Sequence, residues 1–189
     1  MKTKHFYAAI VAICTLAMTC LMSCEKKQQD QEPEPQTQTD NKPVAAFMDF
    51  NITFDSLTLE IFTVSFDYYD ENGAKKNQVI ENPEWALHVQ SASLPAKLGF
   101  HMNLSKKEGV DLSQYQKFKV AYMFTETEQF VNAAGEPILR NQKHYNEGMP
   151  SQGLAIEKID TYLSTYAEHP FESLLIFNAD GTSESVKWE

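Results

Sequence analysis

Cysteine and arginine are scarce in this sequence of 189 residues. Its three cysteines, Cys14, Cys20 and Cys24, all lie within the first 24 residues, so the rest of the chain has no disulfide and no thiol nucleophile. Arg140 is the only arginine, which argues against sites that hold phosphate or carboxylate groups through paired guanidinium hydrogen bonds.

Positive charge is also in short supply. The chain has 16 lysine and arginine residues against 26 aspartates and glutamates, a formal charge of −10. Nucleic acid is therefore excluded as a partner, because phosphate binding needs clustered Lys and Arg. The sequence has neither a glycine-rich phosphate loop nor a Gly-x-Ser-x-Gly motif. We predict that the protein is not an enzyme, has no catalytic residues and carries no cofactor.

Residues 1–23 have the pattern of a secretory signal. Lys2 and Lys4 precede an apolar run from Phe6 to Leu21, and the small residue Ser23 follows. The apolar run is shorter than the roughly 20 residues that a membrane-spanning helix needs. We therefore predict a signal peptide over residues 1–23.

Three residues at the end of this segment match the bacterial lipobox: Leu21, Ser23 and Cys24. The segment thus resembles the signal of a bacterial lipoprotein, and this resemblance implies cleavage before Cys24 and acylation of that cysteine, which becomes the first residue of the mature protein. The membrane would then be a partner through the N-terminal lipid.

Residues 25–43 contain no aliphatic or aromatic side chain, and Glu, Gln, Lys and Pro dominate them. Such a segment buries no apolar surface, so we expect residues 24–43 to be a lipidated cysteine and a disordered tether. Lipobox, polar spacer and aromatic-rich domain together resemble small outer-membrane lipoproteins of Bacteroidota. The resemblance implies a lipid anchor in the outer membrane, with the leaflet orientation open. Asp55-Ser56-Leu57 also resembles the three-residue O-glycosylation site of that phylum.

Residues 44–189 are expected to form one β-rich globular domain, since apolar residues recur with a period of two. Met48, Phe50, Ile52 and Phe54 share one face of a predicted strand. The alternation changes phase between residues 57 and 68, which predicts a β-bulge. Asn72-Gly73 then predicts a hairpin turn.

A second hairpin is expected from residues 85–89 and 98–104. If residues 93–96 turn the chain, Leu87 lies across from Met102 when the apolar faces are buried together. The same register places His88 opposite His101, a weak candidate pair for a metal ion because no third ligand is evident.

The rest of the domain combines strands with one helix. Residues 118–124 predict a strand, apolar spacing predicts a helix over about 154–168, and Asp180-Gly181 predicts a closing hairpin. Residues 131–153 are rich in Gly and Pro and are expected to form a long loop. The predicted fold class is mainly β: an antiparallel β-sandwich-like domain with one helix.

Candidate binding residues follow from aromatics outside the apolar faces. Tyr145, Asn146 and Glu147 in the expected loop, and Tyr115, combine a flat ring with hydrogen-bonding groups, as sugar binding requires. Glu126 and Glu128 are interpreted as a solvated strand face. We expect a non-enzymatic binding domain for a glycan or an envelope protein. The alternative is a structural or assembly subunit of a surface complex.

Overall fold

The structure is a computed structural model that describes residues 41–148 and 152–189, with the backbone alone described for 139–148. All of these residues belong to one compact unit, Thr39–Glu189. Within the described part of the chain, no helix is long and apolar enough to cross a membrane.

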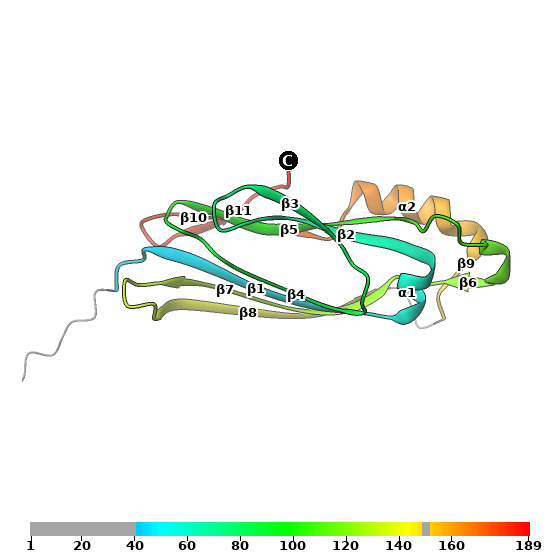
Figure 1. The fold of residues 1–189 in the computed structure, drawn as a ribbon, viewed down its shortest axis with the longest axis horizontal. Helices are drawn as coiled ribbons and strands as arrows, with labels where there is room; N and C mark the ends of the chain where they lie inside the picture. Colours follow the sequence, from blue (N-terminus) through cyan, green and yellow to red (C-terminus); the bar gives the residue numbers. More distant parts are fainter. Residues whose placement is uncertain (1–40, 149–151) are drawn as a thin grey trace, which may run out of the picture. The chain divides into compact units, whose positions relative to one another are not determined.

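Two antiparallel sheets lie face to face as two layers (Figure 1). The first, sheet A, has the order β4-β1-β7-β8 and consists of β4 (Glu84–Gln90), β1 (Ala45–Phe54), β7 (Ala121–Val131) and β8 (Pro137–Gly148). The second, sheet B, has the order β11-β10-β5-β2-β3 and consists of β11 (Ser183–Ser185), β10 (Glu172–Phe177), β5 (Ala96–Lys106), β2 (Phe62–Tyr69) and β3 (Lys75–Val79). The predicted β-sandwich-like fold is confirmed.

The core lies between the two sheets, where alternate residues of each strand point inward. Phe50 of β1 lies at its centre, with its ring centroid 5.6 Å from that of Phe66 and 4.0 Å from that of Phe100 on sheet B. Burial of the predicted β1 face is confirmed. The other inward-facing core residues include Val64, Leu87, Val89, Leu98, Met102, Tyr122, Phe124, Phe130, Leu175 and Phe177.

The prediction of a β-bulge between residues 57 and 68 is wrong. A short helix, α1 (Ser56–Ile61), joins β1 to β2 and changes the phase of the apolar pattern. Asp55 caps it, because its carboxylate accepts a 3.0 Å hydrogen bond from the backbone N–H of Leu57. Ser56, the central residue of the O-glycosylation-like motif, is exposed at the first position of this helix.

The prediction that residues 85–89 and 98–104 pair as a hairpin is also wrong. β4 pairs with β1 in sheet A, where Leu87 lies opposite Phe50, whereas β5 lies between β2 and β10 in sheet B. Both strands bury the predicted apolar faces, but they do so from opposite sides of the core. An alternating pattern specifies the buried face of a strand and leaves its neighbour open.

Within the segment expected to be a long loop, residues 131–153, the described residues 131–148 form a turn and a strand instead. β8 pairs antiparallel with β7 from Pro137 to Gly148, with one shift of register, between Phe130 and Val131 of β7. The turn between them is short: Asn132 accepts hydrogen bonds from the backbone N–H groups of Ala134 and Glu136, and Gly135 has a φ of 80°. The Gly and Pro residues at 135 and 137 therefore mark a hairpin turn.

The helix expected over about 154–168 is present but begins later. Leu154–Ala155 forms β9, which pairs with β6 (Lys117–Phe118), and a 3₁₀ turn, η2 (Ile156–Lys158), leads into α2 (Ile159–Glu168). A second 3₁₀ turn, η1, spans Leu112–Gln114.

Two of the predicted turns are confirmed. β2 and β3 pair on either side of Asn72-Gly73, and β10 and β11 on either side of Asp180-Gly181. The last strand, β11, ends at Ser185, and Val186–Trp188 follows it.

Candidate functional site

Two glutamates interrupt the apolar inner face of β7. Glu126 is 3% exposed and Glu128 is 5% exposed, so their interpretation as a solvated face is wrong. Both lie an even number of residues from Phe124 and Phe130 on the same strand, and those two residues are in the core. This spacing was the signal in the sequence that could have predicted burial of the two glutamates. Carboxylates are rarely kept inside a protein without partners, because burial removes their hydration.

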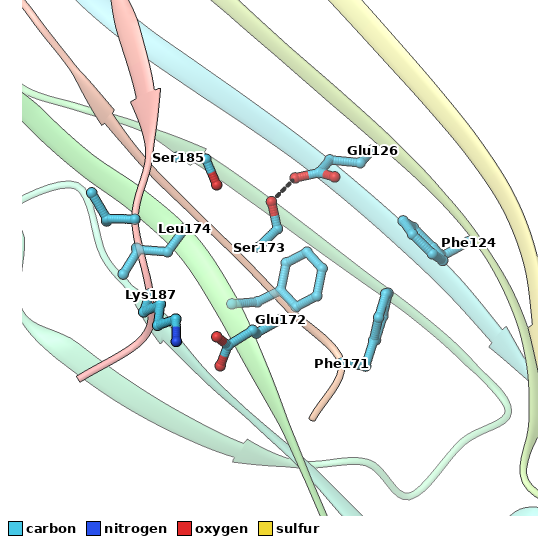
Figure 2. A pocket seen from close by; sticks show the side chains of 10 residues that line it. Phe124, Glu126, Phe171, Glu172, Ser173, Leu174, Ser185 and Lys187 are labelled. Carbon is cyan, nitrogen blue, oxygen red and sulfur yellow. Dashed lines mark hydrogen bonds between the residues drawn. The ribbon is translucent and has the colours of Figure 1, made fainter. Parts of the chain in front are cut away.

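Glu126 reaches across the interior to sheet B. Its Oε1 accepts a 2.7 Å hydrogen bond from the Oγ of Ser173 on β10 (Figure 2). Within sheet A, the strand register places Glu126 opposite Phe50 of β1 on one side and opposite Lys143 of β8 on the other. A hydrogen bond between polar side chains thus joins the two sheets within an otherwise apolar core.

A pocket of about 500 Å³ lies beside this contact. Its aromatic lining consists of Phe100, Phe124 and Phe171, and its polar lining includes Glu126 and Ser173. Ser185, Val186 and Lys187, at the end of β11 and just after it, form another part of the wall, together with Glu172 and Leu174. We call this the inter-sheet pocket.

The outer face of sheet B carries a second group of polar side chains. Asp67 of β2 accepts hydrogen bonds through both carboxylate oxygens: one from the Nδ2 of Asn77 at 2.6 Å and one from the Nδ2 of Asn103 at 2.8 Å. We call Asp67, Asn77 and Asn103 the polar row. Because the carboxylate orients both amide nitrogens, the amide oxygens of Asn77 and Asn103 are held in fixed directions.

Trp188 lies next to the polar row on the same face. Its ring stacks on the imidazole of His101, with centroids 5.8 Å apart and planes at 26°, and its centroid is 5.0 Å from that of Tyr69. The backbone N–H of Trp188 donates to the carboxylate of Glu172, 3.4 Å away. Tyr69 is buried at 6% exposure, whereas Trp188 is partly exposed, with the Nζ of Lys75 5.6 Å from the centroid of its ring.

A groove of about 400 Å³ runs between this outer face and α2. From the sheet it is lined by polar side chains that include Ser65, His101 and Asn103, and from α2 by Leu163 and Tyr166. The hydroxyl of Tyr166 donates a 2.9 Å hydrogen bond to the carbonyl of Met102, which attaches the helix to β5. Polar row, Trp188 and groove therefore form one continuous surface on sheet B, joined through His101 and Asn103.

The proposed metal pair is not brought together. His88 lies on sheet A, where its Nδ1 is 2.7 Å from Asp49, and His101 lies on sheet B, where its Nδ1 is 2.8 Å from Glu172. The two histidines were expected to face each other only because β4 and β5 were expected to pair. Among the described residues, no group of three His, Cys, Asp or Glu side chains is placed to hold a metal ion.

The candidate sugar-binding residues occupy positions different from those expected. Tyr145, Asn146 and Glu147 lie on β8, opposite Phe124, Met123 and Tyr122, and their side chains are outside the described part of the structure. Tyr115 follows η1 and packs, half-buried, against the core. Cys24, the signal peptide and residues 24–40 of the tether also lie outside the described residues.

Three aspartates in turns have carboxyl pKa values below the ordinary 3.8. Hydrogen bonds from the backbone N–H groups of Ala74 and Asn72, together with Lys76, lower the pKa of Asp70. Ser113 lowers the pKa of Asp111, and Thr182 that of Asp180, in each case through side-chain and backbone donors. In all three cases the carboxylate accepts backbone hydrogen bonds within a turn, and none of these residues lines either pocket.

Sequence reasoning missed the polar row, because its residues come from three strands whose order was not predicted. Comparison of the chain with known protein families, proteins and structures adds no further constraint on its function. No family model matches the chain, and no significant match was found among curated proteins or among solved structures.

Proposed function

We propose that the protein is a lipid-anchored cell-envelope protein whose β-sandwich binds a glycan on the outer face of sheet B. The observation that carries the proposal is the surface formed by the polar row, Trp188 and the groove under α2. It combines a partly exposed indole with amide groups held in fixed directions.

The chemistry of this surface suits a sugar. A pyranose ring offers an apolar C–H face, which packs against a flat aromatic ring, and hydroxyls that need donors and acceptors of defined direction. Trp188 supplies the ring, and Asn77 and Asn103 supply amides fixed by Asp67. Ser65 and His101 add further hydrogen-bonding groups along the groove.

The lipid anchor is proposed from the sequence alone. Lys2, Lys4 and the apolar run support export, and Leu21, Ser23 and Cys24 support acylation. An outer-membrane location follows from the resemblance to Bacteroidota lipoproteins. The formal charge of −10 fits a domain that is not drawn to an anionic lipid surface.

Thermal unfolding of the full chain against a panel of soluble polysaccharides tests the glycan proposal. A ligand present at 100 times its Kd stabilises the folded protein by about 2.7 kcal/mol, which gives a measurable rise in Tm. We expect such a rise for at least one polysaccharide, with loss of the rise in Asn103→Ala and in Trp188→Ala.

Asn51→Ala is the matched control, because Asn51 is exposed on sheet A, away from the proposed surface. It should leave the ligand-induced rise in Tm unchanged. A polysaccharide whose effect survives both Asn103→Ala and Trp188→Ala would contradict the proposed site. A panel that produces no rise at all would count against glycan binding.

An assembly role is the second candidate, and one observation favours it. β8 spans 12 residues at the edge of sheet A, and within the described part of the chain its strand partner is β7. A long edge strand offers its backbone groups to a strand from another chain. Light scattering after size exclusion, with and without an envelope extract, tests this role through a defined increase in mass.

A further inference from the structure

We propose that the glycan bound on the outer face of sheet B is acidic, with a carboxylate or a sulfate group on its sugar rings. This inference rests on the proposed function and names the class of ligand that the same surface takes. Two lysines at one end of that surface carry the argument, Lys75 of β3 and Lys97 of β5. We call them the lysine pair.

The lysine pair lies against the aromatic rings of the glycan surface. The Nζ of Lys97 is 5.2 Å from the centroid of the Tyr69 ring, and the Nζ of Lys75 is 5.9 Å from the same centroid. Lys75 also lies over the indole of Trp188, with its Nζ 5.6 Å from that centroid. These distances are within the range of about 6 Å at which an aromatic ring attracts a cation. Two positive charges are thus brought to one ring, beside Trp188.

Strand periodicity places the lysine pair on the same face as the polar row. Side chains an even number of residues apart on a strand point to the same side of the sheet. Lys75 precedes Asn77 by two residues on β3, and Lys97 precedes Asn103 by six residues on β5. A sugar chain that lies along the polar row, parallel to the strands, therefore reaches the lysine pair.

The ammonium groups of the lysine pair have donors left for a ligand. Three other lysines of the domain form ion pairs with aspartates: Lys76, Lys106 and Lys119. Among the residues that the structure describes, no carboxylate is placed to form such a pair with Lys97, whose ammonium group contacts the ring of Tyr69. Lys75 donates one hydrogen bond, to the backbone oxygen of Glu189. Because an ammonium group has three N–H donors, both lysines can also bind an anionic oxygen.

The carboxylates of the same surface already accept hydrogen bonds from the protein. Asp67 accepts two, from the amides of the polar row. Glu172 lies 2.8 Å from the Nδ1 of His101 and accepts a hydrogen bond from the backbone N–H of Trp188. The charge that this surface presents to a ligand is therefore positive, although the chain as a whole has a formal charge of −10. That overall charge disfavours non-specific attraction of a polyanion, so an acidic glycan must be bound by local contacts.

Lysine also suits both acidic groups that sugars carry. Its ammonium group is a compact point charge without the planar fork of arginine, so it binds a carboxylate or a sulfate without selecting between their shapes. The apolar face of the sugar ring packs on an aromatic ring, while the acidic group at the edge of the sugar reaches a neighbouring ammonium group. Tyr69, Trp188 and the lysine pair bring these two kinds of group together.

Matched pairs of acidic and neutral glycans test the inference. Polygalacturonate and its methyl ester share one sugar chain and differ in charge, as do a sulfated galactan and its desulfated form. Calorimetric titration of the full chain at pH 7 and low salt should show about tenfold tighter binding of the acidic member in at least one pair, as two partly exposed ion pairs provide. Added NaCl should weaken binding of that acidic member and leave its neutral partner unaffected, because salt screens exposed charges.

Lys97→Met removes the charge and keeps the apolar stem of the side chain. It should weaken binding of the acidic member by about threefold and leave the neutral member unchanged, and Lys75→Met should do the same. Asn103→Ala should weaken both members, because it removes part of the glycan surface itself. Lys76→Met is the matched control, since Lys76 is the next residue of β3, points to the other face and pairs with Asp70. It should leave both affinities unchanged.

The possible failures of this inference and of the proposed function can be told apart. Neutral members that bind as tightly as their acidic partners in both pairs would overturn the inference and leave glycan binding in place. The same holds for a polysaccharide panel in which only neutral members bind, and for acidic binding that is unchanged when Lys75→Met and Lys97→Met are combined. If no acidic or neutral polysaccharide binds, the proposed function fails together with the inference.

Discussion

The hydroxyl of Ser173 on β10 donates a 2.7 Å hydrogen bond to the carboxylate of Glu126 on β7, and this bond crosses the interior between the two sheets. Glu126 is 3% exposed, so little water is present to replace the donor if it is removed. The bond therefore contributes to stability as well as to the shape of the pocket.

Ser173→Ala should lower the free energy of unfolding by about 1–3 kcal/mol, because it leaves a buried carboxylate with one donor fewer. Urea denaturation monitored by tryptophan fluorescence measures the change. Ser183→Ala, at an exposed position on β11, is the control and should change stability by less than about 0.5 kcal/mol. Equal effects of the two substitutions would show that the bond across the core does not stabilise the fold.

Asp70 should make stability depend on pH at the acid end of the range. Its carboxylate accepts hydrogen bonds from the backbone N–H groups of Ala74 at 2.9 Å and Asn72 at 3.0 Å, and these hold its pKa below 3.8 in the folded state. A lowered pKa stabilises the folded protein above the unfolded-state pKa, and this contribution is lost as the pH falls through the folded-state value.

The parent chain should thus be more stable than Asp70→Asn at pH 7, and the difference should shrink as the pH falls below 3.8. Denaturation at a series of pH values measures it. Glu71→Gln removes a neighbouring charge and should show a smaller difference at pH 7. A difference between the parent chain and Asp70→Asn that stays constant down to pH 2 would contradict the role assigned to this carboxylate.

Gly99 should tolerate no larger residue. A Cβ at this position would lie 2.2 Å from the carbonyl oxygen of Ser173 and 2.7 Å from the Cα of Leu174, both backbone atoms of β10. Gly99→Ala should therefore destabilise the domain by about 1–3 kcal/mol through overpacking.

The control for this substitution is Gly73→Asn. A Cβ at Gly73 would meet no atom within 4 Å, and Asn tolerates its φ of 75° better than most residues, so this substitution should cost less stability than Gly99→Ala. Thermal unfolding of both variants compares them directly. A Gly99→Ala variant as stable as the parent would mean that β5 and β10 can separate without cost.

Acylation of Cys24 is the fourth prediction. Expression of the full chain in a bacterium fed labelled palmitate should label the protein and retain it in the membrane fraction, and Cys24→Ser should lose both the label and the retention. Cys20→Ser is the matched control and should keep both. Labelling that survives Cys24→Ser would show that the lipobox interpretation is wrong.

The buried faces could be predicted from the sequence, because alternation of apolar residues survives whatever strand lies next to them. Met48, Phe50, Ile52 and Phe54 are buried as predicted. The neighbours of each strand could not be predicted in this way. Leu87 and Met102 both point into the core, but from different sheets, and each is compatible with many apolar partners.

The candidate site was mostly missed, for two physical reasons. β8 is largely polar and shows no apolar alternation, so its strand character comes from pairing with β7 instead of from its own sequence. The polar row depends on β2, β3 and β5 lying side by side, which no local pattern reveals. For Glu126 the information was present, since it is in phase with Phe124, but its acidic side chain was taken as a sign of exposure.

The chain after β11 connects the wall of the inter-sheet pocket to the glycan surface. Val186 and Lys187 line the inter-sheet pocket, and Trp188, the next residue, stacks on His101 at the glycan surface. A substitution that repacks this wall of the pocket would therefore also move the indole on the other side of the sheet. Glycan affinity would then depend on the packing of the interior, even for a substitution that leaves the polar row and Trp188 unchanged.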